Sequence, residues 1–378
     1  MVYLCLALFV YVCFALKNNK IIKTTLGNEI IVPAKEKEQK ISWLAVVVLI
    51  LFCGLRALSV GGDLGVYNTN FMDIAKDHNI NAGYQSYGLF FKILNWCCSF
   101  LPVTTGFHMM LTILAIMNIL LMVFAVKKLS PDISLTMFLI MCIDVFIPAL
   151  SMLRQGVAVS LIILSFKYIY EKNWRLFLVC VISAACFHES ALFLLPTYFF
   201  NFFCGKKKSY ILYGLGFFIF FVFAIYDHDI VRWLCKTLGL HYYASYKMQG
   251  SALTMFSYIK NIGMILVFVF FLIYKILRDA ANKPLDRIFV LSLNMFFAVA
   301  LICVYNIVSG GFLIISRMIY YFSWSIILIV PHFIREIKSK KYQVLFTVAV
   351  VVIGLLYLST TVIIRDQFNV VPYSTIFG

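Results

Sequence analysis

Long apolar runs recur from one end of the 378-residue chain to the other, with short basic stretches between them. A bilayer core of about 30 Å is crossed by roughly 20 helical residues, and most of these runs approach that length. They predict twelve transmembrane helices, which cover residues 2–16, 42–58, 106–126, 133–150, 153–170, 174–187, 190–203, 210–226, 257–277, 288–308, 312–332 and 342–363. The pattern is typical of an all-α polytopic membrane protein, with residues 1–378 forming a single integral membrane domain.

Composition narrows the function classes. Hydrophobic residues make up 63% of the chain and the mean hydropathy is +0.95, whereas soluble domains are roughly 45 to 50% apolar. The eleven cysteines have no C-x-x-C spacing, so they predict neither a disulfide framework nor a zinc site. The sequence also lacks a Walker A loop and an H-E-x-x-H motif, which removes the main support for ATP-driven transport and zinc proteolysis.

Lysine and arginine placement predicts the orientation, since basic loops next to membrane helices stay in the cytoplasm. With the N-terminus outside, 22 of the 32 basic residues fall in six inner segments, which are residues 17–40, 127–132, 167–175, 204–209, 275–287 and 335–341. This asymmetry accounts for the net charge of +16. Because the charge forms no continuous face, it does not indicate a nucleic-acid partner.

Two external loops follow from this orientation, residues 59–105 and 227–256. A full span at residues 84–101 would turn every later basic loop outward, so this segment is predicted to be interfacial or re-entrant. The second loop has the pattern of a helix lying in the membrane interface. Three tyrosines follow it, and they suit either sugar stacking or an ordinary aromatic belt: Tyr242, Tyr243 and Tyr246.

Three arginines lie in apolar sequence close to predicted outer helix ends: Arg56, Arg154 and Arg317. An arginine in the middle of a membrane helix costs about 2.5 to 3.5 kcal/mol on insertion scales, so such residues usually face a partner, water or a ligand. Guanidinium groups bind pyrophosphate and carboxylate groups through two hydrogen bonds, which predicts an anionic ligand reached from outside. Alternatively, Arg154 pairs with Asp144 on the preceding helix, and Arg56 extends to the interface with nothing bound.

Further polar residues accompany these arginines. Gln155 follows Arg154 directly, and His188 with Glu189 lies at an outer hairpin tip, where the pair could also form a simple polar cap. In the first external loop a glycine pair precedes Asp63, and Tyr67 follows one helical turn later, so both side chains can face the membrane surface.

Several of these stretches carry a family likeness. "LRQGVAVSLIILSFKYIYEKNWRLFLVCVISAACFHESALFLLP" resembles the EpsG group of Wzy-type polysaccharide polymerases, with Arg-Gln at a helix start and a later His-x-Ser-Ala. "LRALSVGGDLGVY" is similar to the group's Arg, Gly-Asp and Tyr pattern, and "HYYASY", "ISRMIYYF" and "VPYSTIFG" also fit. The glycine pair departs from the expected Gly-Thr-Asp, but it leaves Asp63 in place.

The resemblance implies a GT-C-like bundle with an outer-face active site in the bacterial cytoplasmic membrane. Its substrates would be a donor and an acceptor that are both oligosaccharides linked to undecaprenyl pyrophosphate, with membrane lipid, a flippase and a chain-length regulator as partners. Arg154 and Arg317, with Arg56 third, would stabilise the departing pyrophosphate. His188, Asp63 or Glu189 would act on the acceptor hydroxyl, with no metal and no cofactor.

Two other function classes fit part of the pattern. A lipid-linked oligosaccharide flippase, or another transporter, would share the helix count and the arginines, but such proteins often consist of two similar halves, and the sequence shows no internal repeat. An O-antigen ligase would use the same donor with another acceptor. An O-acyltransferase would handle its donor from the cytoplasmic side, where the predicted loops are short and basic.

Overall fold

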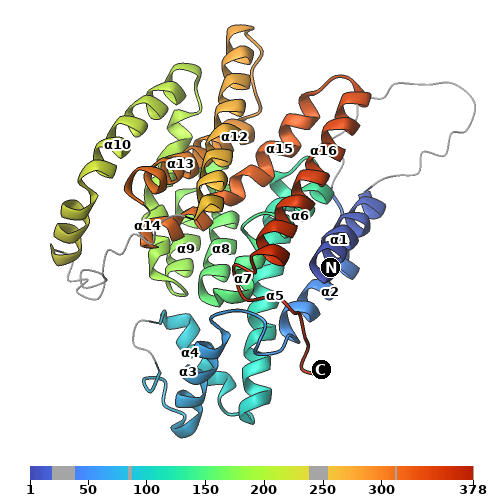
Figure 1. The fold of residues 1–378 in the computed structure, drawn as a ribbon, viewed down its shortest axis with the longest axis vertical. Helices are drawn as coiled ribbons and strands as arrows, with labels where there is room; N and C mark the ends of the chain where they lie inside the picture. The colour runs from blue at the N-terminus through green and yellow to red at the C-terminus, as the bar shows by residue number, and fades with distance from the viewer. Residues whose placement is uncertain (19–38, 84–86, 238–253, 311–312, 378) are drawn as a thin grey trace, which may run out of the picture. The chain divides into compact units, whose positions relative to one another are not determined.

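The computed structural model describes residues 1–18, 39–83, 87–237, 254–310 and 313–377 (Figure 1). Within these ranges every regular element is helical, and the described backbone forms no strand, with an isolated bridge between Arg56 and Thr375. The predicted all-helical architecture is therefore confirmed. The chain divides into two compact units, of which the first contains Met1–Leu195 and Val330–Gly378 and the second Pro196–Ile329.

The first unit is built on helix α8. Its described α-helices are α1 (Val2–Asn18), α2 (Trp43–Gly54), α3 (Leu64–Asp77), α4 (Leu89–Cys98), α5 (Val103–Leu129), α6 (Ile133–Cys142), α7 (Phe146–Ser151), α8 (Leu153–Tyr170), α9 (Trp174–Ala185) and α16 (Lys340–Leu358). Helix α8 packs against both α5 and α9, α2 packs against α5, and α1 and α16 pack against α6. Two thirds of the residues of α8 are buried and none is exposed, as expected for a central, largely apolar helix.

Three further helical segments complete the list of elements. The 3₁₀ segment Glu189–Phe203 and helix α15 (Ile326–Glu336) cross the boundaries between the units, and the π-helical turn Ser359–Ile364 continues α16. In α15, His332 is buried and its Nε2 lies 2.9 Å from the carbonyl oxygen of Leu129, which ties α15 to the end of α5.

The second unit centres on α13 (Arg287–Ser309), which packs against α10 (Lys206–Thr237) and α12 (Met255–Ala280). Helix α14 (Leu313–Met318) and the short 3₁₀ turns Ile319–Tyr321 and Ser323–Ser325 complete it. Two of its buried polar side chains have close partners: the Tyr213 hydroxyl donates to Asn294 Oδ1 over 2.8 Å, and Lys275 Nζ lies 2.6 Å from Asp279 Oδ2.

Six described helical stretches are long and apolar enough to cross a membrane, which are Val103–Leu129, Lys208–Tyr226, Met255–Ala280, Arg287–Ser309, Ile315–Glu336 and Lys340–Ile364. Five further apolar helices are shorter: α1, α2, α4, α6 and α9. The chain is thus a multi-pass membrane protein, and the predicted total of about twelve spans stays a prediction. Helix α4 has ten residues, or about 15 Å, and the interfacial or re-entrant placement of residues 84–101 stays a prediction.

Two predicted spans are broken in the structure. The run 133–150 forms α6 and α7, separated at Ile143, whose backbone is extended with φ −97° and ψ 164°. Buried Asp144 lies in this break, where its Oδ2 accepts a hydrogen bond of 2.9 Å from the Tyr357 hydroxyl. The run 312–332 likewise consists of α14, two 3₁₀ turns and the start of α15. The predicted end of the span 210–226 falls at a kink in α10, at Tyr226.

Candidate functional site around Arg154

The turn before α3 carries the first of the predicted site residues, Asp63. Gly61 precedes it with φ +125°, and a Cβ there would lie 2.6 Å from the carbonyl oxygen of Leu150, so the position requires glycine. The backbone N–H of Asp63 donates to Ser151 Oγ over 3.2 Å. Asp63 occupies the N-cap position of α3, but its carboxylate makes no capping hydrogen bond. The half-buried carboxylate is therefore not used to stabilise the helix end.

Tyr67 lies one helical turn after Asp63 and faces the protein interior, where only 6% of it is exposed. This differs from the expectation that it faces the membrane surface. Its ring centroid lies 5.8 Å from that of Tyr87 and 5.5 Å from that of Phe91. The amphipathic pattern of α3 explains the difference, because Leu64, Tyr67, Phe71 and Ile74 form its buried face.

Arg154, in the first turn of α8, connects these aromatic residues. Its guanidinium carbon lies 3.8 Å from the centroid of the Tyr87 ring, which is a close cation–π contact. Burial raises the pKa of the Tyr67 hydroxyl, and hydrogen bonding to the Arg154 guanidinium and its positive charge oppose this rise. Arg154, Tyr67 and Tyr87 therefore form one polar cluster with Asp63 at its edge.

The hairpin that contains His188 contacts residues 88–90, directly after Tyr87. The N–H of Phe90 donates to the carbonyl oxygen of Cys186 over 3.0 Å, and a Cβ on Gly88 would lie 2.3 Å from that same oxygen. This close backbone approach requires glycine at position 88. His188 is half-buried with Nδ1 3.3 Å from Ser190 Oγ, while Glu189 is exposed at the start of the 3₁₀ segment.

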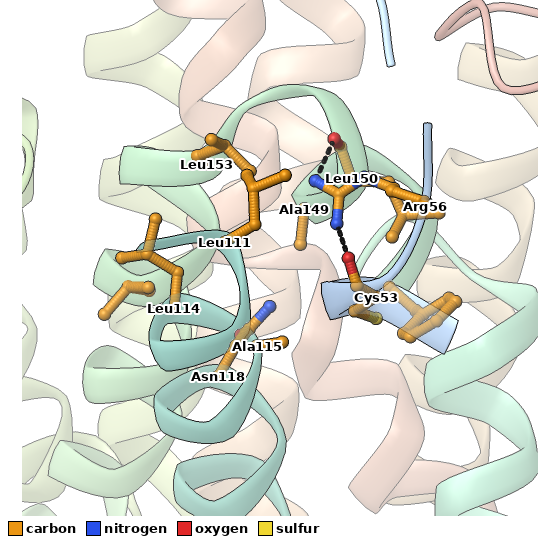
Figure 2. A pocket seen from close by; sticks show the side chains of 11 residues that line it. Cys53, Arg56, Leu111, Leu114, Ala115, Asn118, Ala149, Leu150 and Leu153 are labelled. Atoms are coloured by element: carbon orange, nitrogen blue, oxygen red, sulfur yellow. Dashed lines mark hydrogen bonds between the residues drawn. The ribbon is translucent and has the colours of Figure 1, made fainter. Parts of the chain in front are cut away.

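Arg56 occupies a different environment. Only 2% of it is exposed, and its guanidinium donates to the backbone carbonyls of Cys53 and Leu150 (Figure 2). It also donates to the carbonyl of Val60. The cavity that it borders has a volume of about 20 Å³, room for about one water molecule, and is lined further by Leu111, Leu114 and Asn118. These contacts give Arg56 a structural role at the end of α2, and binding of a substrate by Arg56 stays a prediction.

The remaining predicted residues lie in α8, in α14 or outside the described residues. Arg317 is exposed at the end of α14 in the second unit, and Gln155 is buried in α8. Tyr242, Tyr243 and Tyr246 lie outside the described residues.

Tyr87 is not among the site residues predicted from the sequence. Its only signal is an aromatic residue directly before Gly88, in a stretch that contains no recognised motif. Its contact with Arg154, and the contact of the neighbouring Gly88 with Cys186, join residues far apart in the chain, so no local sequence pattern indicates them.

The first unit also contains an open apolar groove of about 450 Å³. Its walls come from α4, α5, α8, α9 and the second residue after α9, namely Phe90, Ile93, Leu94, Cys97, Met117, Leu161, Ser183 and Phe187. Phe90 is three positions from Tyr87, and Phe187 directly precedes His188. Two separate segments thus join the groove to polar site residues.

Fold and site together define a multi-pass α-helical membrane protein whose first unit contains an arginine–tyrosine cluster and an apolar groove. The model of the EpsG family matches residues 41–375, and the chain therefore belongs to the EpsG family. No curated protein and no solved structure matches it. Membership supports a polysaccharide polymerase-like role in polysaccharide biosynthesis.

Proposed function

We propose that this protein is a Wzy-type polysaccharide polymerase of the bacterial cytoplasmic membrane. It transfers a growing oligosaccharide chain from undecaprenyl pyrophosphate to a new lipid-linked repeat unit at the outer face. The observation that carries this proposal is the Arg154 guanidinium, held over Tyr87 beside Tyr67 and Asp63 at the start of α8. Family membership supports the polymerase class.

The donor reaction breaks the bond between the anomeric carbon and the pyrophosphate oxygen. Negative charge accumulates on the departing lipid pyrophosphate, and positive groups held in place stabilise that charge best when they need no rearrangement. Arg154 is positioned in advance by the Tyr87 ring, and the N-terminal dipole of α8 adds to its positive potential. Arg317 and Gln155 are the further candidates for pyrophosphate binding.

The acceptor reaction forms a bond between a sugar hydroxyl oxygen and the same anomeric carbon. The hydroxyl proton must pass to a base, and Asp63, His188 and Glu189 are the candidates. Asp63 lies beside the arginine–tyrosine cluster and its carboxylate does not cap α3. We therefore place Asp63 first, His188 second and exposed Glu189 third.

The lipid part of the substrate needs an apolar surface next to the charged site. The groove between α4, α5, α8 and α9 is a candidate for this surface, because its lining residues Phe90 and Phe187 are close in sequence to Tyr87 and His188. We propose that it holds the first isoprenoid units of the lipid chain, with the pyrophosphate at Arg154. The aromatic residues Tyr67 and Tyr87, with the tyrosines at 242, 243 and 246, are candidates for sugar contacts.

We propose a reaction that needs neither a metal ion nor a cofactor, because arginine supplies the positive charge. A flippase that delivers the repeat units and a chain-length regulator are the partners that such a polymerase requires. The substrates are lipid-linked sugars, and nucleic acid has no part in this function.

The test uses a deletion strain in which the repeat-unit glycosyltransferases and the flippase are intact, complemented with the wild type or with Arg154→Ala. The deletion strain is expected to accumulate single repeat units on the outer face, and the wild type is expected to restore long polymer. Arg154→Ala is expected to reach the membrane normally without restoring polymer. Repeats trapped on the cytoplasmic side would instead indicate a flippase, and polymer that forms but stays unattached to its acceptor would indicate a ligase.

A further inference from the structure

The C-terminal segment after α16 lies beside the chain that follows α2 (Figure 1). The two segments run antiparallel: Ala57 N–H donates to the Ser374 carbonyl over 3.0 Å, and Ile376 N–H donates to the Leu55 carbonyl over 3.0 Å. Further along, the N–H groups of Gly61 and Gly62 donate to the carbonyls of Asn369 and Phe368, both over 2.8 Å. The C-terminal residues thus hold the glycine turn that directly precedes Asp63.

The part of this segment that meets the glycine turn has its own defined conformation. Asp366 and Asn369 have φ values of 41° and 50°, in the left-handed region that Asn and Asp tolerate better than other non-glycine residues. One carboxylate oxygen of Asp366 accepts from the N–H of Val370 over 2.6 Å and from the N–H of Val371 over 3.2 Å. This carboxylate therefore fixes the direction of the carbonyls at positions 368 and 369.

We propose that residues 366–371, through Asp366 and Asn369, form a positioning element that sets the orientation of the Asp63 carboxylate. This inference rests on the proposed function, in which Asp63 acts on the acceptor hydroxyl. Two hydrogen bonds hold the backbone at Asp63. The Gly62 N–H donates to the Phe368 carbonyl, and the Asp63 N–H donates to Ser151 Oγ, three residues before Arg154. A shift of the 366–371 turn changes the distance between Asp63 and the Arg154 cluster.

The turn can be disturbed without releasing the whole C-terminal segment, because separate contacts anchor it. The Tyr373 ring stacks on Phe52 with a centroid distance of 4.0 Å, and its hydroxyl donates to the Phe52 carbonyl over 2.8 Å. The Tyr3 hydroxyl donates to the Val370 carbonyl over 2.7 Å. Substitution of Asp366 therefore tests the position of the turn and leaves the attachment of the segment to α1 and α2 in place.

The experiment measures chain elongation by the full-length protein in proteoliposomes, with lipid-linked repeat units extracted from a polymerase-deletion strain. Asp366→Ala is expected to lower kcat by about 10- to 100-fold, the range that small misplacements of catalytic groups produce, with KM unchanged. Asp366→Asn keeps one acceptor oxygen and is expected to recover part of the rate. Gln367→Ala, an exposed neighbour in the same turn, is the matched control and keeps the wild-type rate.

The double variant Asp63→Ala, Asp366→Ala separates positioning from general destabilisation. If Asp366 acts only through Asp63, the double variant is no slower than Asp63→Ala alone. If the two losses are independent and multiply, the proposal is wrong. It is also wrong if Asp366→Ala keeps the wild-type rate while Asp63→Ala is inactive, although that second result leaves the proposed function intact. An unchanged rate for Asp63→Ala itself would overturn both the positioning role and the place of Asp63 in the proposed reaction.

A second pair of variants covers the case in which Asp366→Ala does not fold. Asn369→Gly allows the same positive φ and is expected to retain kcat, whereas Asn369→Val places a β-branched side chain at φ 50° and is expected to lose it. Equal kcat values for these two variants, at equal amounts of folded protein, would contradict the proposal.

Discussion

The Arg154 guanidinium lies over the ring of Tyr87, with 3.8 Å between its carbon and the ring centroid. The contact joins the first turn of α8 to the segment before α4, which are separated by more than sixty residues in the chain. An aromatic face attracts a cation without neutralising its charge, so this contact orients the guanidinium and leaves it positive.

Arg154→Lys is expected to lower the elongation rate by about 100-fold or more, close to the effect of Arg154→Ala. Lysine keeps the charge but loses the planar group that stacks on Tyr87 and binds two phosphate oxygens at once. The measurement is the initial rate in proteoliposomes with lipid-linked repeat units. Arg175→Lys is the matched control, since Arg175 also lies near an aromatic ring, 5.7 Å from the Trp174 centroid, but is exposed and outside the cluster. A rate for Arg154→Lys within twofold or so of the wild type would show that charge alone is sufficient.

Two substitutions of Tyr87 separate the effect of the aromatic ring from that of its hydroxyl group. Tyr87→Phe retains the face that contacts Arg154 and is expected to stay close to the wild-type rate. Tyr87→Ala removes the face, and a cation–π contact of about 0.5 to 2 kcal/mol corresponds to a loss of roughly 2- to 30-fold. Both rates are measured at saturating substrate. Equal losses in the two variants would point to the hydroxyl as the important group.

Substitution of Arg56 is expected to affect stability, because its guanidinium donates to backbone carbonyls in a buried site. Arg56→Lys cannot reach all three acceptors, and each buried acceptor left unsatisfied costs about 1 to 3 kcal/mol. We expect a lower melting temperature and less protein in the membrane. Thermal unfolding in detergent, followed by size-exclusion chromatography, measures this effect. An unchanged melting temperature with lost elongation would instead support the predicted substrate-binding role of Arg56.

Gly61 and Gly62 differ in whether their positions can accept a Cβ atom. Gly61→Ala places a Cβ 2.6 Å from the Leu150 carbonyl at φ +125°, so we expect strong destabilisation. Gly62→Ala meets its nearest atom at 3.4 Å, an ordinary contact, so its melting temperature is expected to match the wild type. The same contact explains how the related pattern Gly-Thr-Asp fits this turn. Similar melting temperatures for both variants would contradict the described turn geometry.

Hydropathy identified the helical segments because a membrane span imposes a length and an apolar composition that are visible in sequence. It did not reveal the break between α6 and α7, since Asp144 is one polar residue within an apolar run and its partner Tyr357 is more than two hundred positions away. Arg154 and Asp63 could be proposed from the sequence because charge in apolar sequence and a glycine turn leave local signals. Tyr87 and the C-terminal turn were missed because their roles depend on long-range contacts.

The apolar groove between α4, α5, α8 and α9 allows a test of how the lipid chain is bound. Ser183→Trp fills the groove from α9, and it is expected to raise KM for lipid-linked repeat units about tenfold with little change in kcat, because each buried CH₂ contributes about 0.8 kcal/mol to binding. Val179→Trp is the matched control, one turn earlier on the same helix, exposed and outside the groove. With donors that carry a shortened isoprenoid chain, the wild type loses this contribution as well, and the difference between wild type and Ser183→Trp is expected to shrink. If the shortened donors bind the wild type as tightly as full-length ones, the groove does not hold the lipid chain.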